Sequence, residues 1–314
     1  MRPALFIQRG LTLIEMMVSM TLGLIVVGGV LGIFAANSET RRQMDDLSRI
    51  QENARVAIQL ISRSMREAGG NPCGIPPGTG LIHNTGEAPT SAWWSGGTDF
   101  TSALIGYTNG TGFPANGSVA MVPNSDAIIA VSGNSSSTTV INDTPPNGAM
   151  IIPTNKGLAD GDILFGCSTY SGRGVVFQAG AITAVNEDTL SVSRASSFAG
   201  EVAHMEATAL GKVSAEGWFV GDNGRGGTSL FRAFIGNYGR PGQEEIAPDV
   251  SAMRVTYLLP NTNQYVPANQ IPAGSWPNVT AAHVDLTITR IQNPAASPIT
   301  RTVGLTIKFR NRFK

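Results

Sequence analysis

The sequence predicts an α+β protein, in which one long N-terminal α-helix packs on a large antiparallel β-rich C-terminal domain. Three observations predict it. Residues 11–36 carry a single charge, residues 37–68 mix charged and apolar side chains without Pro or Gly, and Gly, Pro, Ser, Thr and Asn are abundant from residue 69 onward. The first two patterns are typical of a helix with a membrane-spanning first half and an amphipathic second half. The third is typical of short strands joined by turns.

The composition bounds the size and the class of the protein. The 314 residues are 42% apolar, which is enough for a sizeable core in one or two folded units. Lys and Arg together number 22, as do Asp and Glu, so the formal net charge is zero. This balance argues against a nucleic-acid partner, because phosphate backbones bind basic surfaces.

The apolar segment 11–36 is long enough to cross a membrane. Its 26 or so residues span roughly 39 Å as a helix, against ~30 Å for the hydrocarbon core of a bilayer. Three interpretations compete: a cleaved secretory signal, a permanent anchor, and a segment that spans a membrane first and is later buried in a protein assembly. The secretory signal fits poorly, because the apolar stretch is too long and cleavage after Ala35 or Ala36 would place Ile33 or Phe34 where a small residue is preferred.

Glu15 is the unusual residue of this segment. An acidic group deep in a bilayer costs on the order of 2.5–3.5 kcal/mol, although Glu15 near the segment's end could simply lie at the membrane interface. Its context is specific: a leader with Arg2 and Arg9 ends in Gly10, an apolar residue follows, and Glu15 is fifth after the glycine. This sequence resembles the class III signal of type IV prepilins.

The resemblance implies how the segment is processed and used. Residues 1–10 would be the leader, which a prepilin peptidase removes by cutting between Gly10 and Leu11 before it methylates the new amino group of Leu11. Residues 11–36 would form the transmembrane and filament-core helix. The Leu11 amine of one subunit could pair with the Glu15 carboxylate of a neighbour. This ion pair would stabilise the assembly only when the two subunits are in the correct axial register.

The segment departs from the family pattern at two points. The first mature residue would be Leu11, where Phe is usual, and the proline common in the second half of major pilin helices is absent. Gly23, Gly28, Gly29 and Gly32 lower the helix propensity instead. The Gly28 and Gly32 spacing permits close helix contact, but it is equally consistent with the ordinary glycine content of a membrane helix.

Residues 37–68 are predicted to continue the helix outside the membrane. An apolar stripe recurs at steps of three and four residues, and charged residues fall mostly between its members. The stripe consists of Met44, Leu47, Ile50, Ala54, Ala57, Ile61 and Met65. Gly69 and Gly70 would end the helix. A coiled coil is the alternative, although the stripe is brief and rich in Ala.

Residues 69–314 are predicted to form one large β-rich periplasmic domain without internal repeats. Short apolar runs separated by Gly, Asn and Ser predict antiparallel strands. The runs are 126–131, 162–165, 174–178, 217–220, 228–232, 253–259, 283–291 and 300–309.

Several blocks of this domain resemble the PilW-type minor pilins of type IV pili. The blocks surround Asp126 and Asp162 and cover residues 218–232 and 301–312, and residues 303–312 are particularly similar to the usual ending of that family. Residues 75–120 resemble no such block.

The two cysteines and three histidines give few options for site chemistry. Cys73 and Cys167 are expected to form a disulfide in an oxidising periplasm, with two free buried thiols as the alternative. His83, His204 and His283 stand far apart in the sequence, without a second ligand at metal-binding spacing. No cofactor, metal or catalytic residue is predicted, since the nucleophile-elbow, P-loop and dinucleotide-binding patterns are absent from the sequence.

Two loops are candidate binding sites. The Gly-rich segment at Asp222 and Asn223 lacks the ligand spacing of an EF-hand, which favours a hairpin turn over an ion site. Trp93 and Trp94 could form an exposed adhesive patch or a buried anchor of their loop.

The function that best explains both halves is structural, not enzymatic. The resemblance implies a minor pilin that primes type IV pilus assembly and enters the filament at its tip, supporting twitching motility and adhesion. The partners would be other minor pilins, the major pilin, the prepilin peptidase and the inner-membrane assembly platform. The chain would cross the inner membrane once before it reaches a surface pilus. Alternatives are a minor pseudopilin of a type II secretion system, a pilus-borne adhesin that uses residues 75–120, and a membrane-anchored enzyme.

Overall fold

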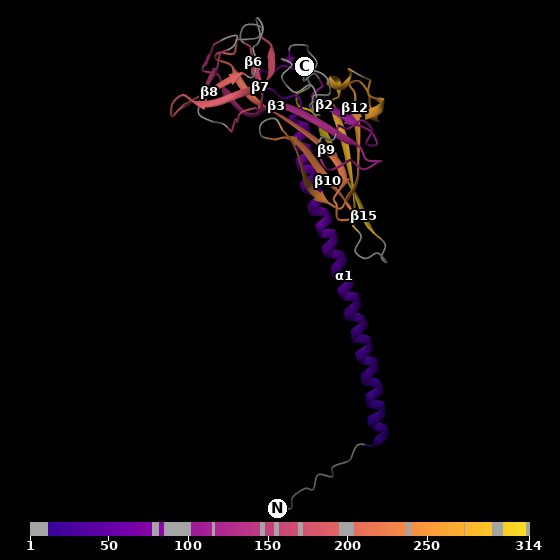
Figure 1. Ribbon diagram of the computed structural model, residues 1–314. Helices are drawn as coiled ribbons and strands as arrows, with labels where there is room; N and C mark the ends of the chain where they lie inside the picture. The colour runs from indigo at the N-terminus through magenta and orange to yellow at the C-terminus, as the bar shows by residue number, and fades with distance from the viewer. Residues whose placement is uncertain are drawn as a thin grey trace, which may run out of the picture. The chain divides into compact units, whose positions relative to one another are not determined.

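The computed structural model describes residues 12–76, 82–84, 102–114, 117–144, 148–153, 157–168, 172–194, 204–236, 240–272, 274–290 and 298–311. The chain divides into two compact units, residues 1–51 and residues 52–314. One long N-terminal helix and a large antiparallel β-sheet domain confirm the predicted α+β, pilin-like fold class (Figure 1).

Helix α1 extends without interruption over Leu13–Glu67, a length of 55 residues. It contains no proline, which would remove a backbone hydrogen bond and break it. It ends where Gly69 adopts a φ of 79°, a left-handed conformation that glycine reaches without strain. Gly69 N then donates to Val131 O (2.8 Å), so the first residues after the helix are already bonded to a strand.

The predicted apolar stripe is buried over most of its length. Within residues 52–314, Ala54, Ala57, Ile61 and Met65 are at most 2% exposed. Met44, at the start of the predicted stripe, belongs to the other unit, residues 1–51, so its burial against the domain stays a prediction. Periodicity shows which face of a helix is apolar, but it carries no information on how far a covering surface extends along that face.

Among the described residues, the larger sheet of the domain has eleven strands, with a main path β11-β10-β9-β6-β7-β8-β5-β4. Off this path, β3 pairs with β9, β2 pairs with β3, and β1 pairs with β7. Its strands are β1 (Ile82–Asn84), β2 (Leu104–Tyr107), β3 (Ala127–Thr139), β4 (Asn142–Asp143), β5 (Met150–Pro153), β6 (Ile163–Cys167), β7 (Gly174–Ala184), β8 (Thr189–Arg194), β9 (Ala209–Asp222), β10 (Thr228–Ile235) and β11 (Pro241–Pro248). The described pairings are antiparallel except that of β1 with β7, which is parallel. No hairpin connects β1 to β7, so their relative direction is not set by a tight turn.

In the described part of the chain, the smaller sheet has four strands in the order β13-β12-β14-β15. They are β12 (Val250–Leu258), β13 (Tyr265–Pro267), β14 (Ala281–Arg290) and β15 (Ile299–Lys308), and two short 3-10 helices, η3 (Ala268–Gln270) and η4 (Trp276–Asn278), follow β13. Each of the predicted apolar runs overlaps one of the long strands of the two sheets. The Gly-rich segment at Asp222 is the hairpin turn between β9 and β10, as predicted, and Asn223 N donates there to Gly227 O (3.0 Å).

Among the described residues, two apolar clusters contribute to the core of the larger sheet. One gathers side chains from the middle of the sheet around Phe165, Phe219 and Phe231, and the rings of Phe219 and Phe231 are stacked with centroids 5.8 Å apart. The other includes Met150 and Phe177 and lies toward the β5 and β8 end. Rings and branched side chains that interdigitate in this way give the packing density of a folded interior.

A buried polar joint connects the two sheets at the start of β3. Asp126 is 4% exposed. Its Oδ2 accepts from Val255 N (2.9 Å), and its Oδ1 accepts from Asn109 N (3.0 Å). Asp126 N donates to Met253 O (2.8 Å), and Met253 N donates to Ser125 Oγ (3.0 Å). The joint therefore ties β12 of the smaller sheet to β3 of the larger one.

Replacing Asp126 with alanine should destabilise the domain. Asp126→Ala leaves the Asn109 and Val255 amides without their acceptor, and a buried unsatisfied group costs roughly 1–3 kcal/mol each. The free energy of unfolding, measured by urea denaturation of the full chain in detergent, should fall by about 2–4 kcal/mol. Asp285→Ala, at a half-exposed position, is the control and should change it less, because the Asp285 side chain is 40% exposed; equal effects of the two substitutions would contradict the assignment.

Candidate functional site

The first turn of α1 forms a capping box between Thr12 and Glu15. Thr12 N and Thr12 Oγ1 both donate to Glu15 Oε2 at 3.0 Å. In return, Glu15 N donates to Thr12 Oγ1 (3.4 Å). The two side chains thus satisfy backbone amides that have no partner inside the helix, and a carboxylate at this end also complements the helix dipole. Glu15 is therefore held in place by its own helix start.

The surface of α1 after Glu15 is apolar on all sides. Fifteen large apolar side chains between Leu13 and Phe34 are each at least 52% exposed. Among the described residues α1 is the one helix long and apolar enough to cross a membrane, with a mean hydropathy of 2.3 in its most apolar window. An exposed apolar surface of this extent marks a contact with lipid or with another protein.

The polar and small residues inside this stretch fit a non-aqueous environment. Ser19 Oγ donates to Glu15 O (2.6 Å), and Thr21 Oγ1 lies 2.9 Å from Val18 O. These bonds satisfy the hydroxyls without water or a partner chain. A Cβ added at Gly28 or Gly32 would meet no atom within 4 Å, so this side of the helix is open to close approach by another helix.

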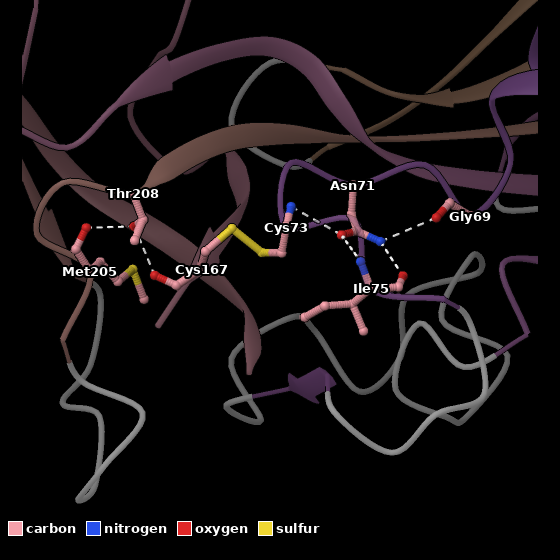
Figure 2. The surroundings of a disulfide bond; sticks show 7 residues. All are labelled: Gly69, Asn71, Cys73, Ile75, Cys167, Met205 and Thr208. Atoms are coloured by element: carbon pink, nitrogen blue, oxygen red, sulfur yellow. Dashed lines mark hydrogen bonds between the residues drawn. A yellow bond between two sulfur atoms is a disulfide. The ribbon is translucent and has the colours of Figure 1, made fainter. Parts of the chain in front are cut away.

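The second notable region is the disulfide between Cys73 and Cys167, whose Cα atoms lie 5.6 Å apart (Figure 2). Cys73 belongs to a short loop after α1, and Cys167 is the last residue of β6. The side chain of Asn71 organises that loop. Its Oδ1 accepts from Cys73 N (3.1 Å) and Ile75 N (3.0 Å), and its Nδ2 donates to Gly69 O (3.2 Å) and Ile75 O (2.6 Å).

On the other side of the disulfide, Thr208 Oγ1 donates to Cys167 O (2.8 Å), as Figure 2 shows. The disulfide therefore connects a loop to the end of strand β6, and each of the two is fixed by side-chain hydrogen bonds. It lies one short loop beyond the end of α1, where it closes a chain segment with a sequence separation of 94.

A comparison with protein families gives one match. The model of a family described as the prokaryotic N-terminal methylation motif matches residues 6–31. The match supports a type IV pilin-like protein. It covers Glu15 and most of the apolar stretch of α1. No curated protein and no solved structure matches the chain.

The predicted site residues of this pilin-like chain fall partly outside the described residues. Gly10 and Leu11 lie outside them, so cleavage and methylation stay predictions, as does the role of Glu15 in register. Cys73 and Cys167 are brought together. Trp93, Trp94 and the side chain of His83 are outside the described residues, and among those described no three His, Cys, Asp or Glu residues are grouped to hold a metal.

Two residues that organise these regions were missed by sequence reasoning. Thr12 carried a usable signal, because Thr followed by Glu three residues later, just before an apolar run, is the capping-box pattern. Asn71 carried a weaker signal: an Asn just after a helix-ending glycine pair is typical of side-chain-stabilised turns, but its four hydrogen bonds to three residues depend on the path of the loop.

Removing the disulfide should lower the stability of the domain. For the double substitution Cys73→Ser and Cys167→Ser, the chain-entropy model gives a loss of as much as ~4–5 kcal/mol, which residual structure in the unfolded chain reduces. Urea denaturation of the full chain with and without reductant measures it. Reductant should reproduce the loss in the wild type and have no effect on the double variant. Alkylation of two free thiols in protein isolated from cells without reductant would exclude the bond.

Proposed function

We propose that this chain is a minor pilin of the PilW type, which primes type IV pilus assembly and is incorporated at the filament tip. The observation that carries the proposal is a methylation motif on residues 6–31 together with a helix that bears fifteen exposed apolar side chains. A subunit with this N-terminus is processed at the membrane and then needs a second apolar environment. The core of a helical filament provides one.

Glu15 is the residue that distinguishes filament assembly from simple anchoring. In lipid, a carboxylate near the end of the apolar segment carries a desolvation cost, which favours leaving the membrane once an opposite charge is available. The mature amino group at Leu11 is such a charge. A subunit whose Glu15 meets the Leu11 amine of its neighbour has one axial position in which both charges are paired.

The domain supports the narrower PilW-type assignment. The sequence blocks that resemble this group fall on β3, β6, β9, β10 and β15, which belong to both sheets. The resemblance thus extends through the domain, beyond the N-terminal motif that pilins and pseudopilins share. Its partners would be other minor pilins, the major pilin and the assembly platform of the inner membrane, with the domain in the periplasm before assembly.

Mass spectrometry of the mature N-terminus tests the processing step. The chain isolated from membranes should begin at Leu11 and carry one additional methyl group on its amine. A substitution of Gly10 that blocks the peptidase should leave the leader attached and the amine unmethylated. A wild-type chain that retains Met1 or that begins at residue 37 would contradict the proposal.

Replacing Glu15 tests assembly separately from membrane insertion. Glu15→Ala should insert into the membrane at least as well as the wild type, because it removes a charge, whereas its amount in sheared filaments should fall by roughly tenfold or more for a lost pair of about 1.4 kcal/mol or greater. Glu39→Ala, on the same helix, is the matched control. Normal incorporation of Glu15→Ala would remove the register role.

Deletion of the gene separates a pilus from a secretion role. A minor pilin predicts lost or strongly reduced piliation and twitching with normal exoprotein secretion. The reverse result would assign the chain to the pseudopilins of a type II secretion system, which carry the same N-terminal signal.

A further inference from the structure

The charges of α1 mark the two ends of its apolar segment. Residues 16–38 carry no charged side chain, and Glu15 and Glu39 are the nearest charged residues on its two sides. At 1.5 Å per residue the uncharged segment spans roughly 34 Å, close to the ~30 Å hydrocarbon core of a bilayer. When this segment spans a membrane, the residues just after Ser38 therefore lie among the lipid headgroups of the leaflet on the side where the chain continues into the domain.

Arg41 and Arg42 are the first basic residues beyond this segment. They follow Ser38 by three and four positions, or about 4–6 Å along the helix axis. The headgroup region on each side of a bilayer is about 5–7 Å thick, so both residues reach the level of the lipid phosphates. Both side chains are exposed, and within the described residues neither guanidinium group has a hydrogen bond or an ion pair.

A hollow on this face of α1 combines the two arginines with uncharged hydrogen-bond donors and an aromatic ring. It encloses about 630 Å³ within residues 1–51, and its lining includes Phe34, Asn37, Ser38, Arg41 and Arg42. Phe34, 73% exposed, is at the membrane end of the hollow, and Arg41 is about 10 Å farther along the axis. An apolar side chain followed by cationic donors matches the order of acyl chain and phosphate in a phospholipid.

The nearby acids lie farther from the membrane or on another side of the helix. Asp45 also lines the hollow, but it is four positions, or about 6 Å, farther from the apolar segment than Arg41. Glu39 is two positions before Arg41 and so lies on nearly the opposite side of α1, where its Oε1 accepts from Gln43 Nε2 (3.4 Å). The hollow is therefore cationic at the level of the lipid phosphates.

We propose that this hollow binds an anionic phospholipid of the leaflet next to the domain while α1 spans the membrane. The two guanidinium groups bond the phosphate oxygens, Asn37 and Ser38 donate further hydrogen bonds, and the Phe34 ring contacts the start of an acyl chain. The lipid fixes how deeply the segment is inserted, which holds Glu15 at the opposite interface. The proposal rests on the membrane-spanning stage of the proposed function and adds a ligand to that stage.

Native mass spectrometry of the full chain tests the headgroup preference. The chain is inserted into nanodiscs with equal amounts of phosphatidylglycerol and phosphatidylcholine that carry the same acyl chains, and the lipids retained after release are counted. Retained phosphatidylglycerol should exceed phosphatidylcholine roughly tenfold, because each arginine near the headgroups favours an anionic lipid. Equal retention by an inserted chain would overturn this proposal alone. A chain that does not insert would overturn the membrane-spanning stage as well.

Paired variants locate the bound lipid. Arg41→Gln with Arg42→Gln should abolish the preference, and Arg41→Lys with Arg42→Lys, which keeps both charges, should retain most of it. Arg49→Gln with Arg55→Gln is the matched control: it removes the same charge at least seven positions, or about 10 Å, farther from the membrane, and should leave the preference unchanged. All four side chains are exposed on α1, so no packed core is disturbed. Equal effects of the two glutamine pairs would contradict the proposal.

Two further measurements distinguish other occupants of the hollow. An excess of soluble glycerol phosphate should not displace the retained phosphatidylglycerol, because it lacks the acyl chain that Phe34 contacts. Displacement would mean that the hollow is a site for free phosphate. A wild-type chain without lipid preference, whose Arg41→Gln and Arg42→Gln variant is lost from sheared filaments, would mean that the arginines contact an acidic partner protein. Either result overturns the proposal.

Discussion

The apolar side chains of the first half of α1 impose the constraint on which the behaviour of this protein depends. Burying one large apolar side chain is worth roughly 1.5–3 kcal/mol, and fifteen of them are exposed between Leu13 and Phe34. That much surface does not remain in water. The segment must be in lipid or against other proteins at every stage, and a chain that changes from one to the other needs a device that distinguishes them. Glu15 is suited to this, because lipid offers a carboxylate no partner and a neighbouring subunit can offer one.

The sequence predicted the helix and the β-rich class because each has a local signal. The helix signals are local: α1 contains no proline, and Gly69 and Gly70 follow its end. The strand signals are also local, because the alternating runs in β10 and β14 extend over only a few residues. The extent of burial along the helix had no such signal, because periodicity does not show how far a covering surface extends. The parallel pairing of β1 with β7 was also missed, because it depends on how a three-residue strand reaches a distant partner.

Long-range polar contacts in the domain were beyond prediction for the same reason. Asp143 and Arg194 form an ion pair in which both side chains are 1% exposed. No local sequence pattern around either residue predicts the other as its partner. The joint at Asp126 joins residues more than a hundred positions apart. At the candidate site, Glu15 was identified from its neighbours in the sequence, whereas the hydrogen bond from Thr208 Oγ1 to Cys167 O joins residues 41 positions apart and arises only when separate segments meet.

The capping box has one further consequence for how Glu15 can act. A carboxylate has two oxygens, and both hydrogen bonds from Thr12 end on Oε2. The side chain is therefore already held in one rotamer, with its entropy lost when the helix forms and not when a partner arrives. Oε1 can accept an incoming amine while the cap stays intact, so the helix start need not unravel to form the pair. Thr12 thus preorganises the acid beside it, and a chain with Ala at position 12 would keep the charge but lose its fixed direction.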